Sequence, residues 1–208
     1  MKYVLVILIS YLFGSIPWAL VIGKLFYQKD VRQYGSGNLG ASNAGRVLGK
    51  PAAIMVTFFD GLKAVISMAV ANMIAPETVA FAGVACCIGH CFPIFAQFKG
   101  GKAVATTYGY FLGLVIFVNH NFFWGFLFPV IAFFVILYIT RIVSISSMLA
   151  VGLEVIASVL IIKNPLSVSV CLLVIWLLII YRHRSNIERL RNGTESKVKW
   201  MGKLPGEK

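Results

Sequence analysis

The sequence contains few of the side chains from which enzymes build a nucleophilic or acid–base centre. Only 7 Asp and Glu residues and 3 His residues occur among 208, against 19 Lys and Arg residues. No Ser-His-Asp, Cys-His or two-carboxylate arrangement is apparent. If the chain is an enzyme, we therefore expect it to position its substrates and stabilise charge, without a covalent intermediate.

Cysteine is scarce too, and its placement predicts neither disulfides nor a metal site. All four cysteines lie inside apolar runs, where cysteine usually acts as a small hydrophobic residue: Cys86, Cys87, Cys91 and Cys171. His90 and Cys91 are adjacent and would point about 100° apart on a helix, which suits a shared metal poorly. We predict no bound metal and no cofactor.

Charged residues make up only 12% of the chain and hydrophobic residues 59%, which excludes a water-soluble domain of this size. A transmembrane helix needs about 20 apolar residues. Seven apolar segments use up most of the chain: roughly 3–25, 51–75, 78–97, 103–119, 122–140, 143–162 and 165–181. We therefore predict an all-α integral membrane protein with seven transmembrane helices, some of them short or broken. A single transmembrane domain spans residues 1–184, and a basic tail spans residues 185–208.

The basic residues orient these spans in the membrane. Seven spans put the termini on opposite sides, with sixteen basic residues on the side of the C-terminus and only Lys2 and Lys163 on the other. Because cytoplasmic loops carry an excess of Lys and Arg, the N-terminus should lie outside and the C-terminus in the cytoplasm. The net charge of +12 then reflects loops beside anionic membrane lipid, and no nucleic-acid partner is predicted. Every polar motif falls on this cytoplasmic face, which favours an active site there.

One polar motif is a loop of small and hydroxyl-bearing residues at positions 35–43. Its glycines let the backbone turn and approach a ligand, and its Ser and Asn side chains add neutral hydrogen-bonding groups. Arg46 follows with a fixed charge suited to phosphate. The alternative to a phosphate-binding loop is a flexible connector. The loop contains neither a Walker A sequence nor a dinucleotide-binding fingerprint. We favour substrate binding by Ser36, Gly37, Asn38, Ser42 and Asn43.

A second motif is the turn Lys99-Gly100-Gly101-Lys102, which we call the 99–102 turn. From this segment alone, a plain helix boundary with interfacial lysines is nearly as good an interpretation. As a site, Gly100 and Gly101 would expose backbone N–H groups at the start of a helix, where the helix dipole attracts anions. Lys102 would add a full charge.

Two weaker signals complete the cytoplasmic face. Ser144 and Ser147 share a helical face near Arg141, although ordinary bonding of Ser back to the helix would explain them equally. His183 and Asn186 also share a face, and His183 would bind phosphate or move a proton near neutral pH. The alternative for that segment is a cluster of charges that anchors the last span.

Ionisable residues also occur within the spans. Asp60 and Lys63 are three positions apart, so we expect them to neutralise each other and to join helices. Glu154 has no obvious local partner, and the sequence does not decide whether it is protonated or bonded across helices.

Taken together, the motifs resemble those of the bacterial acyl-phosphate:glycerol-3-phosphate acyltransferase family, the PlsY type. The similarity covers nearly the whole chain in the family's order: Gly14-Ser15-Ile16-Pro17, Tyr34 to Asn43 with Arg46, Gly89-His90 with Phe92-Pro93, Phe98 to Lys102, Arg141 with Ser144 and Ser147, and Tyr181 to Ile187. The sequence departs from the family pattern at two positions, in both cases by a similar small residue. The family usually has Thr in place of Ser42 and Gly in place of Ala103.

The resemblance implies an enzyme in phospholipid biosynthesis that acylates the 1-hydroxyl of glycerol 3-phosphate with a fatty acyl phosphate. The products are lysophosphatidic acid and inorganic phosphate, and the enzyme sits in the bacterial cytoplasmic membrane. The catalytic residues would be Arg46, Lys102 and His183; Gly100, Gly101, Ser144, Ser147 and Asn186 would join the loop in binding substrate. The partners are the two substrates and membrane lipid, and a monomer is compatible with the sequence. The alternative function is a transporter of phosphate or a phosphorylated metabolite.

Overall fold

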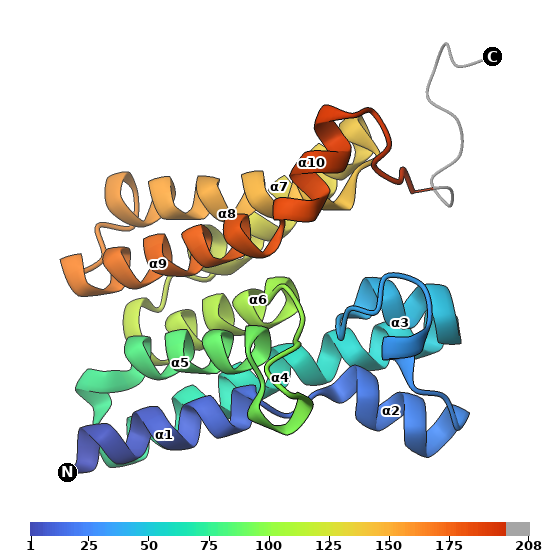
Figure 1. Ribbon diagram of the computed structural model, residues 1–208. Helices are drawn as coiled ribbons and strands as arrows, with labels where there is room; N and C mark the ends of the chain where they lie inside the picture. The colour runs from blue at the N-terminus through green and yellow to red at the C-terminus, as the bar shows by residue number, and fades with distance from the viewer. Residues whose placement is uncertain (199–208) are drawn as a thin grey trace.

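The computed structural model describes residues 1–198, and every regular element in that range is a helix (Figure 1). The end of the predicted basic tail lies outside the described residues. Short 3-10 turns and two π-helical segments, Val115–Asn119 and Phe123–Leu127, link the α-helices. The α-helices are α1 (Lys2–Gly14), α2 (Trp18–Tyr27), α3 (Ala41–Leu48), α4 (Lys50–Ile74), α5 (Val79–Cys91), α6 (Val104–Leu114), α7 (Phe128–Thr140), α8 (Val143–Leu160), α9 (Leu166–Arg182) and α10 (Arg184–Arg191).

The predicted all-α membrane fold is confirmed, but the count of seven spans is not. Five helical segments in the described range are long and apolar enough to cross a membrane, and α9 with α10 makes a sixth if this bent pair is one span. The segment Val104–Asn119 is apolar but shorter. This stretch includes the π-helical segment Val115–Asn119 and ends where His120 takes a left-handed conformation.

The helices form two layers that meet along their length. Figure 1 shows α1, α2, α4, α5 and α6 in one layer and α7, α8 and α9 in the other. Helix α4 packs on α6, α1 on α5, and α7 on α8, while α5 meets α9 between the layers. The tightest crossing needs glycine, because a Cβ on Gly109 of α6 would lie 2.0 Å from the carbonyl oxygen of Gly61 on α4.

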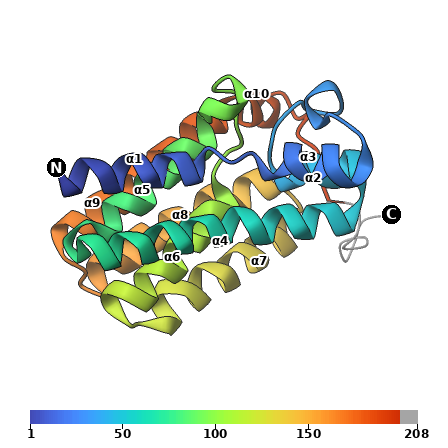
Figure 2. The same ribbon diagram turned by 90° about the horizontal axis from the view of Figure 1, so that it is seen from below.

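One end of the bundle collects the polar motifs. Figures 1 and 2 show the N-terminus at one end and α3 and α10 at the other. The first span breaks at Pro17, between α1 and α2, because proline has no backbone N–H with which to continue the helix. Such a break releases backbone groups that need partners, and the carbonyl of Ile16 accepts a hydrogen bond from Lys63. This break is the reason why α2 can diverge toward α3.

Candidate active site

The 35–43 loop is held by one buried side chain, Asn43. Its amide oxygen accepts from the backbone N–H and the hydroxyl of Ser36 at 2.8 and 3.2 Å, and its amide nitrogen donates to the carbonyls of Val31 and Tyr34. Asn43 is only 1% exposed. The expectation that Asn43 binds substrate directly therefore does not match its contacts: this residue fixes the backbone of the loop.

The other polar residues of the loop remain accessible. Ser36 and Ser42 are exposed at its surface, and Gly37 allows the backbone to turn with φ of 66°. Asn38 reaches across the site and donates to the carbonyl of Gly100 at 3.2 Å. Arg46 on α3 is also exposed. The loop thus presents hydroxyls and one guanidinium beside the 99–102 turn.

The two glycines of the 99–102 turn use their backbone N–H groups within the protein. The N–H groups of Gly100 and Gly101 donate to the carbonyls of Cys91 and His90 at 3.2 and 3.1 Å, so they are not open to an anion. Arg182 donates to the carbonyls of both glycines at 3.0 Å. The N–H groups that have no partner inside a helix are those of the first turn of α6, directly after the 99–102 turn.

Lys102 is the half-buried cation of this region. Its ammonium donates to the side-chain oxygen of Asn186 on α10. Burial lowers the pKa of Lys102 from 10.5 to about 8; Glu195 opposes this shift, while Arg189, Arg46 and Arg182 reinforce it. Three guanidinium groups near one ammonium, with a single carboxylate among them, make a site that attracts anions.

Sequence reasoning missed Glu195, which organises the far side of the site. Its carboxylate accepts from Asn186 at 2.5 Å, from the hydroxyl of Ser144 at 2.8 Å and from Arg189 at 2.7 Å. Burial raises the pKa of Glu195, but these three hydrogen bonds outweigh it and the net shift is downward. A carboxylate in a polar tail gives no periodic signal, so its contacts emerge only from the fold.

His183 joins α9 to α10, where the chain bends by 56°. The side chain is 3% exposed, and its Nδ1 donates to the carbonyl of Ile179 at 2.8 Å. Because Nδ1 carries the proton in the neutral ring, Nε2 keeps its lone pair. Burial lowers the pKa of His183 from 6.5 to about 4, so the ring is neutral at physiological pH.

Ser147 bonds back to its own helix. Its hydroxyl donates to the carbonyl of Val143 at 2.8 Å, and the residue is fully buried. The structure therefore favours the back-bonding alternative for Ser147 over substrate binding. Arg141, at the start of the same segment, stacks over the ring of Tyr138 at 4.8 Å, and its carbonyl accepts from the N–H of Val198.

Comparison with known proteins decides the family. A sequence profile described as glycerol-3-phosphate acyltransferase matches residues 4–193. The chain belongs to the glycerol-3-phosphate acyltransferase family. A protein of that name from Bacillus velezensis is 46% identical over 205 residues, covering 97% of this chain and 100% of its own. One from Enterococcus faecalis is 42% identical and covers 95% of this chain and 93% of its own.

Solved structures agree with this acyltransferase assignment. The crystal structure of PlsY (YgiH), an integral membrane glycerol 3-phosphate acyltransferase, in its glycerol 3-phosphate form aligns with a TM-score of 0.86. It is 35% identical and covers 95% of this chain and 96% of its own. Its lysophosphatidic acid form gives a TM-score of 0.82 at 34% identity, with 95% of each chain covered. The predicted family, enzyme class and multi-pass membrane character are confirmed.

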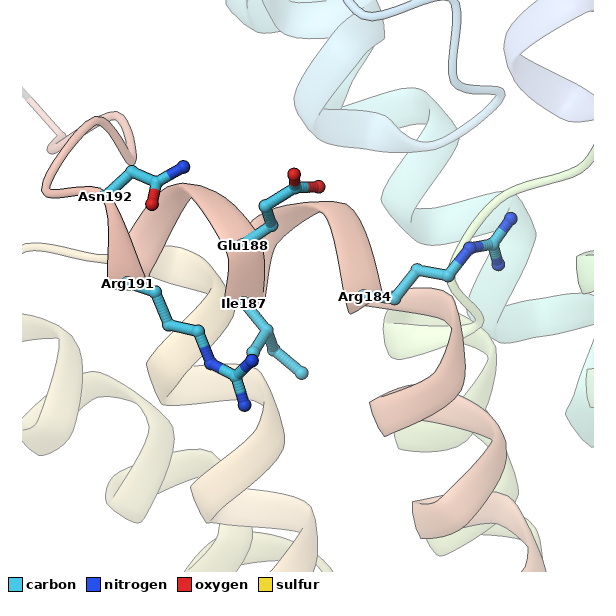
Figure 3. A pocket seen from close by; sticks show the side chains of 5 residues that line it. All are labelled: Arg184, Ile187, Glu188, Arg191 and Asn192. Atoms are coloured by element: carbon cyan, nitrogen blue, oxygen red, sulfur yellow. The ribbon is translucent and has the colours of Figure 1, made fainter.

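A surface hollow lies along α10. Figure 3 shows the side chains that line it, namely Arg184, Ile187, Glu188, Arg191 and Asn192. The side chain of Arg184 is directed away from that of Arg191. These positions repeat on one face of the helix, and Asn186 lies on the opposite face. Within residues 1–198, no group of three or more His, Cys, Asp or Glu side chains is arranged to hold a metal ion.

Proposed function

We propose that this acyltransferase transfers a fatty acyl group from acyl phosphate to the 1-hydroxyl of glycerol 3-phosphate, giving lysophosphatidic acid and inorganic phosphate. One observation carries the assignment of the site: Arg46, Arg182 and Arg189 lie close enough to Lys102 to lower its pKa, and the carboxylate of Glu195 opposes them. Both proposed substrates bear phosphate, and arginine and lysine are the side chains best suited to bind it.

In the proposed reaction the hydroxyl oxygen of glycerol 3-phosphate attacks the acyl carbonyl carbon. The bond between that carbon and the phosphate oxygen breaks, and inorganic phosphate leaves with the electron pair. Arg46 and Lys102 stabilise the charge on the departing phosphate, as preorganised cations do in other transfer reactions. Because acyl phosphate is already activated, the step needs no enzyme nucleophile.

The hydroxyl proton goes to a phosphate oxygen of the substrate. A phosphate monoester has a second pKa of about 6, closer to neutral pH than the value of about 4 to which burial lowers the pKa of His183. General bases work best when their pKa lies near the operating pH. His183 is therefore the weaker of the two candidate acceptors, and its fixed ring orients the α9–α10 bend.

Substrate binding is assigned to the accessible residues of the loop, namely Ser36, Asn38 and Ser42. Asn186 is buried between Lys102 and Glu195, so we assign it the role of orienting the ammonium. Asn43, Gly100, Gly101, Ser144 and Ser147 support the backbone or the carboxylate around them. The acyl chain lies in hydrocarbon between the spans. Residues 1–184 act as one transmembrane domain in the bacterial cytoplasmic membrane, with the N-terminus outside and the site facing the cytoplasm.

The direct test uses purified protein in lipid, acyl phosphate and labelled glycerol 3-phosphate, with lysophosphatidic acid and inorganic phosphate measured together. We expect equal amounts of both products. Lys102→Ala should lower turnover by about 100-fold or more, as loss of one charge-stabilising group does elsewhere. Lys99→Ala is the matched control, since this exposed lysine begins the same turn. Product from acyl-CoA but none from acyl phosphate would overturn the donor, and uptake without product would favour a transporter.

A further inference from the structure

Three ionisable side chains that the proposed chemistry does not use are buried together inside the bundle. Asp60 and Lys63 of α4 form the predicted ion pair, with 2.9 Å between Oδ1 and Nζ. The same ammonium lies 2.9 Å from Nδ1 of His90 on α5 and donates to the carbonyl of Ile16 at 3.1 Å. None of the three ionisable side chains is more than 6% exposed. The cluster therefore joins α4, α5 and the break between α1 and α2.

The ring of His90 connects this cluster to the 99–102 turn. A lysine ammonium only donates hydrogen bonds, so with the ring proton on Nε2, Nδ1 of His90 accepts from Lys63. The same Nδ1 lies 3.4 Å from Oδ1 of Asp60. The opposite edge of the ring faces Gly101, where an added Cβ would lie 2.0 Å from Nε2. The carbonyl of His90 also accepts from the N–H of Gly101 at 3.1 Å. The side chain and the backbone carbonyl of His90 thus both contact Gly101.

The turn is held from its other side by residues of the site. Arg182 and Asn38 donate to its glycine carbonyls, at 3.0 and 3.2 Å for Gly100. The next residue, Lys102, carries the charge that we assign to the phosphate. Any movement of the His90 ring would shift this turn, and a shift of 1 Å at a reacting group can cost about 100-fold in rate.

We propose that Asp60, Lys63 and His90 form a positioning network that seats Gly101 and thereby sets where Lys102 meets the substrate phosphate. The inference rests on the proposed function. These three residues do not touch the reacting atoms. Buried charges are costly in a membrane protein, and a network that fixes one geometry gives them a use that an apolar contact would not provide.

The glycines of the turn allow a size-exchange test. A Cβ on Gly101 would collide only with the His90 ring among the nearest atoms, so Gly101→Ala should be relieved by His90→Asn. Asparagine keeps an amide oxygen near the Nδ1 position and removes the far edge of the ring. Gly100→Ala is the matched control. Its Cβ would lie 2.0 Å from the carbonyl oxygen of His90, which His90→Asn leaves in place.

Two quantities are measured for each purified variant: kcat/KM for glycerol 3-phosphate, and the inhibition constant of inorganic phosphate. The inhibition constant does not depend on the fraction of enzyme that is folded, so a merely structural role would not move it. Gly101→Ala should lower kcat/KM by about 100-fold and weaken phosphate inhibition by about tenfold. Adding His90→Asn should recover about tenfold of the lost kcat/KM and restore phosphate inhibition, whereas Gly100→Ala should show no recovery.

Several results would overturn the network. They are a double variant no better than Gly101→Ala, equal recovery of Gly100→Ala, or a phosphate inhibition constant that never changes. If His90→Asn does not accumulate, His90→Ser makes the same room and is compared in the same way. Wild-type protein that forms no lysophosphatidic acid from acyl phosphate would instead refute the proposed function, so the two failures are distinguishable.

Discussion

Raising the pH should switch off the charge that Lys102 brings to the active site. Burial lowers the pKa of this ammonium to about 8, so its charge is present below that pH and is lost as the pH rises through it. The charged fraction is roughly nine-tenths at pH 7, half at pH 8 and one-tenth at pH 9, since each pH unit changes the ratio tenfold. Activity that needs the ammonium should fall with the same steepness.

The loss of activity at alkaline pH should occur at different pH values for kcat/KM and for kcat. The value of kcat/KM reports the free enzyme, so we expect its alkaline limb near pH 8. Bound phosphate places negative charge beside Lys102, which raises the pKa of an ammonium. The limb of kcat should therefore lie at higher pH. The substrate phosphate itself, with a second pKa of about 6, is already fully ionised in this range.

The assay measures initial rates of lysophosphatidic acid formation from pH 6.5 to 9.5, with spontaneous hydrolysis of acyl phosphate subtracted at each pH. The control is Lys102→Arg, because a guanidinium stays charged throughout this range. It should be less active than wild type at pH 7 and should lose the limb near pH 8. The reasoning is refuted if Lys102→Arg keeps the wild-type limb, or if wild-type kcat/KM is constant to pH 9.5.

Three other changes test the supports of the site. Asn43→Ala removes the hydrogen bonds that hold the 35–43 loop, so it should destabilise the protein by about 2–3 kcal/mol in thermal unfolding, with Ser42→Ala near wild type as the control. His183→Asn should keep turnover within about tenfold of wild type from pH 6 to 8; a loss of 100-fold or more would make His183 the proton acceptor. Gly109→Ala must separate α4 from α6 and should cost about 1–3 kcal/mol, and an unchanged unfolding midpoint would contradict that crossing.

Much of the fold follows from local properties of the sequence. Apolar runs predicted the long apolar helices to within a few residues, because burial in lipid demands continuous hydrophobic stretches. They did not predict the polar helices α3 and α10. The break at Pro17 and the Asp60–Lys63 pair were also predictable, since a missing N–H and a three-residue helical spacing act locally. The count of seven spans is not confirmed, because Val104–Asn119 is shorter than the other apolar helices and α9 reaches span length only together with α10.

The contacts of the site were harder to predict, because they join segments far apart in the sequence. Glu195 meets Ser144 and Asn186 only once α8, α10 and the tail are folded together. His90 looked like half of a poor metal site in the sequence, and its partner Lys63 lies 27 positions away on another helix. Hydrophobic periodicity specifies which face of a helix is buried, but it does not specify which polar groups meet there.

The residue types that bind phosphate are also those that hold a backbone in place, so residue type alone does not separate the two roles. Asn43 and Ser36 lie in one loop with similar chemistry, yet Asn43 is buried with its amide saturated and Ser36 is exposed. A ligand can reach only groups that the fold leaves accessible, so burial separates the two roles. The proposed reaction uses an activated donor and needs placement more than reactive groups. A site for such a reaction therefore uses many of its polar side chains to hold its own backbone, while the exposed Arg46 and the half-buried Lys102 carry the charge that we assign to phosphate.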